Sequence, residues 1–198
     1  MKSSRRWAPS RDDEGVPPGR LLLLTGAPGC GKTTVAPLVA DHAPLSVCLD
    51  LDWFFAKLRQ GAISPWKTEA HPQNRVVLSA AAAAVAAFAS GAYFTVAEGI
   101  LYPFMLDLFV KACEPLGIDI NYVVLRAPID IVQARVLSRT TEPEHFGALA
   151  DEKVVGDLWT MFEKEGVPER HRFDTGEWPP GAIADEIYRR CLAGEFLL

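Results

Sequence analysis

Eight residues near the start of the chain have the types and the spacing of a phosphate-binding loop. The octet Gly26-Ala27-Pro28-Gly29-Cys30-Gly31-Lys32-Thr33 satisfies the pattern GxxxxGK[ST], and the apolar run Leu21–Leu24 precedes it. Glycines let backbone N–H groups turn inward toward phosphate oxygens, and the helix expected after the loop adds the positive end of its dipole. Lys32 is expected to reach the β- and γ-phosphates, and the Thr33 hydroxyl to ligate Mg²⁺. An unliganded strand–helix turn has no need of a lysine–threonine pair at this position.

Acidic residues follow two other apolar runs. Asp50 and Asp52 lie in LSVCLDLDWFF, and Glu98 closes AYFTVAE. The carboxyl ends of parallel strands meet at one edge of a sheet, and alternation along an extended segment would point Asp50 and Asp52 the same way. One of the two could hold hydrated Mg²⁺ while the other accepts a proton from an attacking hydroxyl, and Glu98 has the position of a carboxylate that contacts Mg²⁺ or its water. The alternatives are a helix cap at Asp52 and a solvated strand end at Glu98.

Composition narrows the class of protein. The 198 residues are 49% hydrophobic and 23% charged, as in a globular enzyme of about one domain. The net charge of −5 gives no general attraction to nucleic acid or to an anionic membrane, so neither is an expected partner. The four cysteines form no CxxC pair, which fits free thiols in a cytoplasmic protein. No heptad or exposed apolar stripe stands out, and we expect a monomer or a homodimer.

The order of apolar and helical segments predicts the fold. Residues 1–19 carry charges and prolines without periodicity and are expected to form a tail. From residue 20 onward, continuous apolar runs alternate with helical stretches, which suits a parallel sheet covered on both faces. The expected strands are Leu21–Leu24, Leu45–Leu49, Tyr93–Ala97, Tyr122–Leu125 and His171–Phe173. The expected helices are Lys32–Asp41, Leu51–Gln60, Gln73–Ser90, Phe104–Pro115, Ile129–Arg139, Asp151–Glu165 and Ala182–Ala193. The prediction is therefore an α/β, three-layer P-loop NTPase fold with a five-stranded parallel sheet.

On these motifs the chain resembles the small P-loop kinases grouped around shikimate kinase, gluconate kinase, chloramphenicol phosphotransferase and adenylate kinase. It is similar to AAA-family ATP-binding proteins of the nucleoside-monophosphate-kinase-like type, and the resemblance covers nearly all of residues 20–191. The chain lacks the glycine triplet that shikimate kinases carry after their third strand. It also lacks a clear set of arginines for a substrate carboxylate, so shikimate itself is not the expected acceptor.

The resemblance implies roles for the acidic residues. Asp50-Leu-Asp52 resembles the DxD of shikimate kinases, which makes Asp50 a ligand in the metal shell and Asp52 the base. The dipeptide Glu98-Gly99 is similar to the EG that closes the corresponding strand in uridine kinases.

The resemblance also implies a small lid at about residues 139–150. Arg135 and Arg139 are four residues apart and share a helical face. Related kinases use such a pair to close over the transferring phosphate, which implies nucleotide binding for Arg135 and a lid contact for Arg139. The alternative is that the two arginines pair with surface acids such as Asp130 or Glu142.

The segment RHRFDTGEWPP resembles the part of these kinases that carries the adenine pocket. Asp174, Thr175 and Gly176 would contact the base mostly through backbone atoms. The chain has no NKxD guanine signature, which favours ATP over GTP.

The acceptor is expected to bind to residues 53–75, which usually form the acceptor region of this fold. The segment holds the aromatic set Trp53, Phe54, Phe55, Trp66 and His71, which suits a partly apolar, ring-bearing ligand, and Tyr102-Pro103-Phe104 could form the opposite wall. The expected contacts are Trp53, Phe54, Arg59, Trp66, Arg75 and, from the opposite wall, Tyr102. The alternative for Trp53, Phe54 and Phe55 is an ordinary place in the core of an amphipathic helix.

These inferences define an ATP- and Mg²⁺-dependent kinase that moves the γ-phosphate to a hydroxyl of a small molecule. An antibiotic, a nucleoside and a sugar-like acceptor stay open, and the alternative function is a regulatory module that binds ATP without phosphorylating an acceptor. The residues expected to take part in catalysis are Asp52, Lys32 and Arg139. The expected metal ligands are Thr33, Asp50 and Glu98. The expected nucleotide contacts are Gly26, Ala27, Pro28, Gly29, Cys30, Gly31, Lys32, Thr33, Thr34, Arg135, Asp174 and Thr175.

Overall fold

The computed structural model describes residues 19–138 and 152–198. Five strands form one sheet in the order β2-β3-β1-β4-β5, and every neighbouring pair of strands is parallel. The strands are β1 (Arg20–Thr25), β2 (Ser46–Asp50), β3 (Phe94–Glu98), β4 (Asp119–Arg126) and β5 (Arg172–Asp174). The predicted five-stranded parallel sheet is confirmed, and the carboxyl ends of all its strands lie at one edge.

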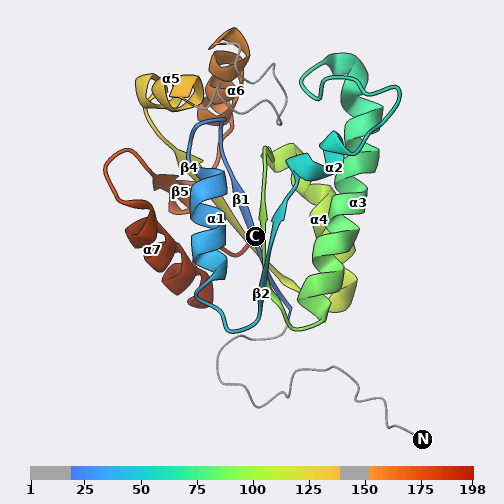
Figure 1. The fold of residues 1–198 in the computed structure, drawn as a ribbon. Helices are drawn as coiled ribbons and strands as arrows, with labels where there is room; N and C mark the ends of the chain where they lie inside the picture. Colours follow the sequence, from blue (N-terminus) through green and yellow to red (C-terminus); the bar gives the residue numbers. More distant parts are fainter. Residues whose placement is uncertain (1–18, 139–151) are drawn as a thin grey trace, which may run out of the picture.

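Helices cover both faces of the sheet, which completes the three predicted layers (Figure 1). On one face α1 (Lys32–Ala40) packs against α7 (Pro180–Leu192), and on the other α3 (His71–Ser90) packs against α4 (Leu106–Cys113). The remaining helices, near the carboxyl ends of the strands, are α2 (Asp52–Ala56), α5 (Ile129–Ser138) and α6 (Glu152–Lys164). Single 3₁₀ turns occur at Thr68–Ala70, Pro103–Met105, Glu114–Leu116 and Glu169–His171.

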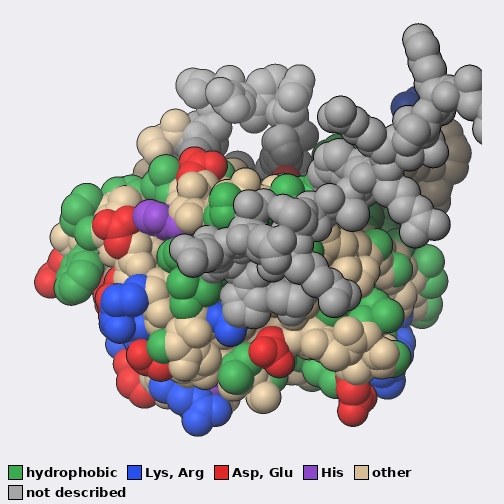
Figure 2. All heavy atoms as spheres, turned by 90° about the horizontal axis from the view of Figure 1, so that it is seen from below, with side chains coloured by type: hydrophobic (Ala, Val, Ile, Leu, Met, Phe, Trp, Pro, Cys, Tyr) green, Lys and Arg blue, Asp and Glu red, His purple; other side chains and the backbone are tan. Residues whose placement is uncertain are grey.

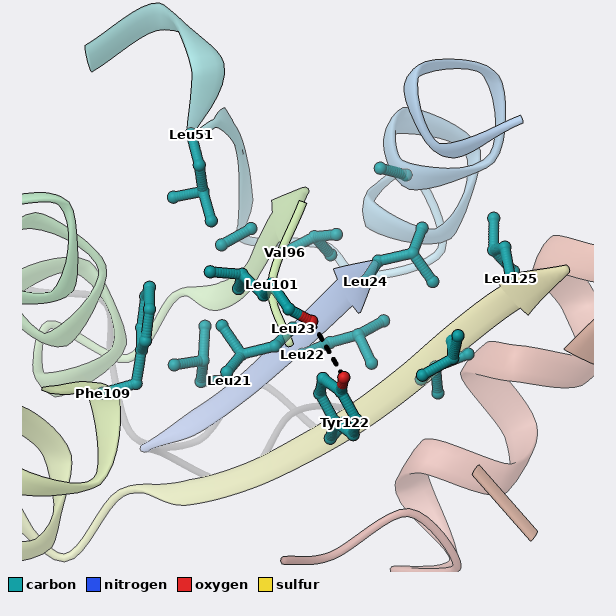
Figure 3. Packing of buried hydrophobic residues seen from close by; sticks show 14 of the residues in the cluster. Leu21, Leu22, Leu23, Leu24, Leu51, Val96, Leu101, Phe109, Tyr122 and Leu125 are labelled. Carbon is teal, nitrogen blue, oxygen red and sulfur yellow. Dashed lines mark hydrogen bonds between the residues drawn. The ribbon is translucent and has the colours of Figure 1, made fainter. Parts of the chain in front are cut away.

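The centre of the core is β1, whose four leucines, Leu21–Leu24, are fully buried (Figure 3). Burial on both faces explains why this strand reads as a continuous apolar run. The loop after β3 is fastened to this centre by hydrogen bonds. The Tyr122 hydroxyl donates to the Leu101 carbonyl oxygen at 2.9 Å, and the Thr25 hydroxyl accepts from the Leu101 N–H at 2.8 Å. The segment that follows Glu98 is therefore held rigidly beside the end of β1.

Helix α2 is shorter than the sequence indicates, because it ends at Ala56 rather than at Gln60. The chain instead runs in an extended loop toward α3, where side chains of that helix hold it. Gln73 accepts a hydrogen bond from the Ile63 N–H at 2.8 Å and donates to the Ile63 carbonyl oxygen at 2.7 Å, while Asn74 donates to the Pro65 carbonyl oxygen at 2.7 Å. These side-chain bonds replace the backbone bonds of a longer helix.

The end of the molecule opposite the carboxyl ends of the strands is seen in Figure 2. Acidic and basic side chains are intermingled on its described surface, so neither sign of charge dominates the visible, described part of that face. No helix within the described ranges is both long enough and apolar enough to cross a membrane. The predicted lid at about residues 139–150, and all but Gly19 of the predicted tail, lie outside the described residues.

Candidate active site

The phosphate-binding loop connects β1 to α1, as its sequence predicts, and two of its glycines lie against the neighbouring segment of chain. Gly26 has a φ of 146°, and a Cβ there would collide with the Leu125 carbonyl oxygen. Gly29 has a φ of +84°, and its Cβ would lie 2.7 Å from the Val132 carbonyl oxygen. Gly31 is left-handed as well, and α1 begins directly after it. The glycines are needed both for the backbone conformation and for close approach to β4 and α5.

Lys32 is folded over this loop. Its side chain is buried, and Nζ donates hydrogen bonds to the Gly26 carbonyl oxygen at 3.0 Å and the Ala27 carbonyl oxygen at 3.2 Å. The ammonium group is thus held above the loop backbone, and the start of α1 contributes its positive dipole end to the same place. A phosphate group would find a preorganised positive site here.

Asp50 and Glu98 are direct neighbours at the ends of β2 and β3, because the register of the two strands pairs them. Asp52 lies two residues after Asp50, as the first residue of α2, and its N–H donates to Asp50 Oδ1 at 2.8 Å. The register also places Leu24, the next-to-last residue of β1, beside Glu98. The three acidic residues expected from the sequence therefore lie at the same edge of the sheet, at the end of β3 that neighbours β1.

Glu98 is a buried carboxyl group in an unusual electrostatic setting. Burial raises its pKa to about 7, and the charges of Asp50 and Asp52 add to that increase. The Lys32 charge and a hydrogen bond with the Thr33 side chain act in the opposite direction. Within the described residues, no three His, Cys, Asp or Glu side chains converge as a ready metal site.

Arg135 connects the loop to the segment after β5. Its guanidinium donates to Thr175 Oγ1 at 3.2 Å, to the Thr175 carbonyl oxygen at 3.0 Å and to the Gly29 carbonyl oxygen at 3.4 Å. Thr175 is buried, and its hydroxyl also lies 3.0 Å from the Cys30 carbonyl oxygen. Sequence reasoning placed Arg135 and Thr175 at the nucleotide, and the structure joins both of them to the phosphate-binding loop.

The other residues expected at the nucleotide occupy different positions. Asp174 is exposed at the end of β5, and its Oδ1 accepts a hydrogen bond from the Gly176 N–H at 2.7 Å. Thr34 is an exposed residue in the first turn of α1. Arg139, expected in the lid, lies outside the described residues.

A cavity of about 380 Å³ lies beside the acids, between α2, α3, the β3–α4 segment and α6. Asp52 is part of its wall, and so are three of the six residues expected at the acceptor: Trp66, Arg75 and Tyr102. The other three, Trp53, Phe54 and Arg59, do not line it. Trp53 is 51% exposed and packs edge-on against Phe54.

The wall also contains Phe55 and His71 from the expected acceptor segment and Phe104 from the expected opposite wall. Pro65 and Asn74 lie within the expected segment as well. The residues of the wall that lie outside the expected segments are Leu78, Ile100, Met105, Asp107, Leu108, Leu158 and Met161. The last two come from α6, more than 50 residues after the β3–α4 segment. The segment Tyr102-Pro103-Phe104 lies at the cavity as expected, and the rings of Tyr102 and Phe104 stack with their centroids 5.5 Å apart.

Comparisons with known proteins agree with this geometry. A family model described as an AAA domain matches residues 21–163, which is more than half of the chain. No curated protein sequence matches the chain.

Solved structures with similar folds include several small kinases. APS kinase of Mycobacterium tuberculosis, in complex with AMPPNP and APS, superposes with a TM-score of 0.66 at 18% identity, covering 89% of this chain and 99% of that one. The tunicamycin resistance protein of Deinococcus radiodurans gives 0.62 at 18% identity over 90% and 98% of the two chains. Shikimate kinase of Acinetobacter baumannii, in complex with shikimate, gives 0.59 at 19% identity over 91% and 96%. At these identities the likeness shows a shared fold.

Proposed function

We propose that this protein, which belongs to the AAA domain family, is an ATP- and Mg²⁺-dependent phosphotransferase that moves the γ-phosphate to a hydroxyl group of a small molecule. The observation that carries the proposal is the position of Asp52. This residue lines the cavity, and its charge also acts on Glu98 beside the phosphate-binding loop. One carboxylate therefore stands between a phosphate site and a space that fits a small ligand.

The phosphate end would bind the nucleotide through groups already in place. Backbone N–H groups of the loop and the start of α1 would receive phosphate oxygens, and Lys32 would exchange its bonds to Gly26 and Ala27 for bonds to the β- and γ-phosphates. Arg135 and Thr175 fix the outer side of the loop. Asp174 and Thr175 would contact the base.

Thr33, Asp50 and Glu98 fit a magnesium ion. Two neighbouring carboxylates and a hydroxyl offer the hard oxygen donors that Mg²⁺ prefers, with water completing the shell. The raised pKa of Glu98 comes first from burial, and the negative charges of Asp50 and Asp52 add to it, so a cation at this place would relieve repulsion among the three acids. When bound, Mg²⁺ supplies charge neutralisation for the transferring phosphate.

Asp52 is the better of the two candidate bases. It lines the cavity where an acceptor would lie, whereas Asp50 is not part of the cavity wall and receives the Asp52 N–H on its Oδ1. Asp52 would accept the proton of the acceptor hydroxyl as its oxygen attacks the γ-phosphorus and the bond to the β-phosphate oxygen breaks. By accepting the Asp52 N–H, Asp50 would also fix the backbone at Asp52 and so orient its side chain. Arg139 would add positive charge to the transferring phosphate from the lid.

The test is phosphoryl transfer by Asp52→Asn. With ATP, Mg²⁺ and a panel of nucleosides, sugars, aminoglycosides and phenicols, mass spectrometry should find a product heavier by one phosphate. Asp52→Asn should retain ATP affinity and lose turnover by about 10²- to 10⁴-fold, because a general base contributes that much. Asp185→Asn, which changes an exposed carboxylate on α7, is the matched control and should behave as wild type.

Two results would contradict the proposal. Transfer by Asp52→Asn at the wild-type rate would remove the base assignment. The second result is that ATP binds but is not consumed, although compounds of the panel are shown to fill the cavity. That result would favour the regulatory module.

A further inference from the structure

We propose that the acceptor is an uncharged compound with an apolar ring system and hydrogen-bond donors, and that the cavity rejects acceptors carrying a carboxylate or phosphate. This inference rests on the proposed function, because the ligand of this cavity is a phosphoryl acceptor only if the protein is a kinase. The composition of the cavity wall, the arrangement of its charges and one buried amide support it.

The wall is mainly apolar. Eleven of its sixteen residues are aliphatic or aromatic or proline, and the five others are Asp52, His71, Asn74, Arg75 and Asp107. A volume of about 380 Å³ lies in the range of small-molecule sites. Moving a ring from water onto such a surface is favourable by roughly 25 cal/mol per Å² of apolar area. Phe104 and Trp66 offer ring surface to a ligand, whereas the buried ring of Tyr102 packs against Phe104 and Phe162.

The charges of the wall do not suit an anion. Asp52 and Asp107 contribute two carboxylates, and Arg75 is the one arginine or lysine among the lining residues that the structure describes. Arg75 also acts on Asp107, whose pKa is held below its ordinary value chiefly by a hydrogen bond from Lys111 and, to a lesser extent, by Arg75. The positive charge of Arg75 is thus directed in part to an acid of the wall. A carboxylate or phosphate of the ligand would therefore lack a dedicated cation in this apolar space, and an unpaired buried charge is costly.

A buried amide selects for donors rather than acceptors. Asn74 is 8% exposed and lines the cavity, and its amide group donates to the Pro65 carbonyl oxygen at 2.7 Å. Its Oδ1 atom has no hydrogen-bond partner within the described part of the chain. A buried acceptor without a partner raises the free energy of the empty site, so a ligand that donates a hydroxyl or amide hydrogen to it gains affinity.

A matched pair of probes separates charge from shape. We would use 1-(2-naphthyl)ethane-1,2-diol and 2-(2-naphthyl)glycolate, which share the ring and the benzylic hydroxyl and differ in CH₂OH against carboxylate. Two of the chain's three methionines, Met105 and Met161, line the cavity. Their ¹³C-labelled methyl groups therefore report by NMR whether a probe is in the cavity, with Met105→Leu and Met161→Leu to assign the signals.

The diol should shift both methyl signals with a dissociation constant on the order of 1 mM, as expected for a ligand of this size. The glycolate should bind at least about tenfold more weakly, equivalent to about 1.4 kcal/mol. Equal or tighter binding of the glycolate would overturn the inference. Failure of both probes to shift either signal would overturn it as well.

Asp107→Asn tests the origin of the selectivity. It should bring the affinity for the glycolate closer to that for the diol by about threefold or more. The affinity for the diol should change by less than this, because asparagine keeps a side-chain oxygen and only the charge is removed. The control is Asp157→Asn, because Asp157 pairs with Lys153 on α6 as Asp107 pairs with Lys111 on α4, both at i,i+4, but does not line the cavity. An equal change in both variants would attribute the effect to overall charge and reject the role of the wall.

Binding and catalysis can fail separately in this design. If the diol fills the cavity but no compound of the panel gains a phosphate, the proposed function fails while the selectivity of the cavity stands. If a carboxylate- or phosphate-bearing compound is the efficient acceptor, the enzyme is a kinase and the selectivity inference is wrong.

Discussion

The two ends of the proposed active site are built from different parts of the chain. The phosphate end consists of backbone atoms, three glycines with positive φ and a few polar side chains, all joined by hydrogen bonds. The cavity consists of side chains from α2, α3, the β3–α4 segment and α6, and most of these are apolar. A backbone site recognises what every nucleotide has in common, whereas a wall of side chains can change with each acceptor without altering the loop. The comparison predicts that substitutions at one end leave binding at the other intact.

Within the phosphate end, the largest effect is expected at Lys32. Lys32→Ala removes the charge held over the loop and should reduce phosphoryl transfer by about 10²- to 10³-fold or more, as loss of a preorganised electrostatic group does. The naphthyl diol should still shift the Met105 and Met161 signals with unchanged affinity. The measurements are single-turnover transfer and methyl NMR. A loss of diol binding would show that the two ends are not independent.

Two glycine substitutions separate the cost of a left-handed backbone from the cost of a close contact. Gly29→Ala requires a left-handed φ and places Cβ 2.7 Å from the Val132 carbonyl oxygen, so it should lower the free energy of unfolding by about 3 kcal/mol or more. Gly61→Ala, in the loop after α2, has a φ of +72° but no atom within 4 Å of the added Cβ, and should cost about 1 kcal/mol. Urea unfolding of both variants measures the difference, and similar losses would mean that the close packing of the loop on α5 contributes nothing.

We expect the Glu98 carboxylate to lower the stability of the nucleotide-free protein and to be required for Mg²⁺-dependent transfer. Its pKa rises from 4.5 to about 7 on folding, so its contribution to stability is fully present below about pH 4.5 and is lost as the pH rises through about 7. Glu98→Gln removes the buried charge. Without nucleotide or Mg²⁺, the variant should be more stable than wild type by about 2–3 kcal/mol at about pH 8, and the two should converge toward pH 4.5.

The same variant should lose Mg²⁺-dependent transfer. Urea unfolding at the two pH values and a transfer assay check both statements. A stability difference that does not change with pH would contradict the origin given for it.

The smallest effect is expected at the outer side of the loop. Thr175→Val keeps the shape of the side chain and removes the hydroxyl that lies between Arg135 and the Cys30 carbonyl oxygen. ATP affinity should fall about tenfold, by about 1–2 kcal/mol, because buried polar groups lose a partner. Thr160→Val on α6, whose hydroxyl bonds the Gly156 carbonyl oxygen within its own helix, is the control for calorimetric titration with ATP. Unaltered affinity in Thr175→Val would confine Thr175 to a structural role.

The phosphate-binding loop and the five-stranded parallel sheet could be predicted from local patterns in the sequence. Leu21–Leu24 is buried on both faces and must be apolar throughout, and the glycine, lysine and threonine positions follow from local backbone geometry. Asp50 and Glu98 could be placed together because parallel strands end at one edge. These features depend on residues close in the chain or on a regular element, so a local pattern is enough to find them.

The part of the cavity wall that comes from α4 and α6 could not be predicted from the sequence. Leu158 and Met161 reach it because α6 packs over the β3–α4 segment, and no spacing in the sequence relates the two. Trp53 and Arg59 had the expected types and position but do not line the cavity, since α2 stops at Ala56 and Gln73 holds the following loop against α3. Side-chain packing between distant elements depends on how whole layers meet. The chemistry of the phosphate end is thus local, and the selectivity of the acceptor end is a property of the fold.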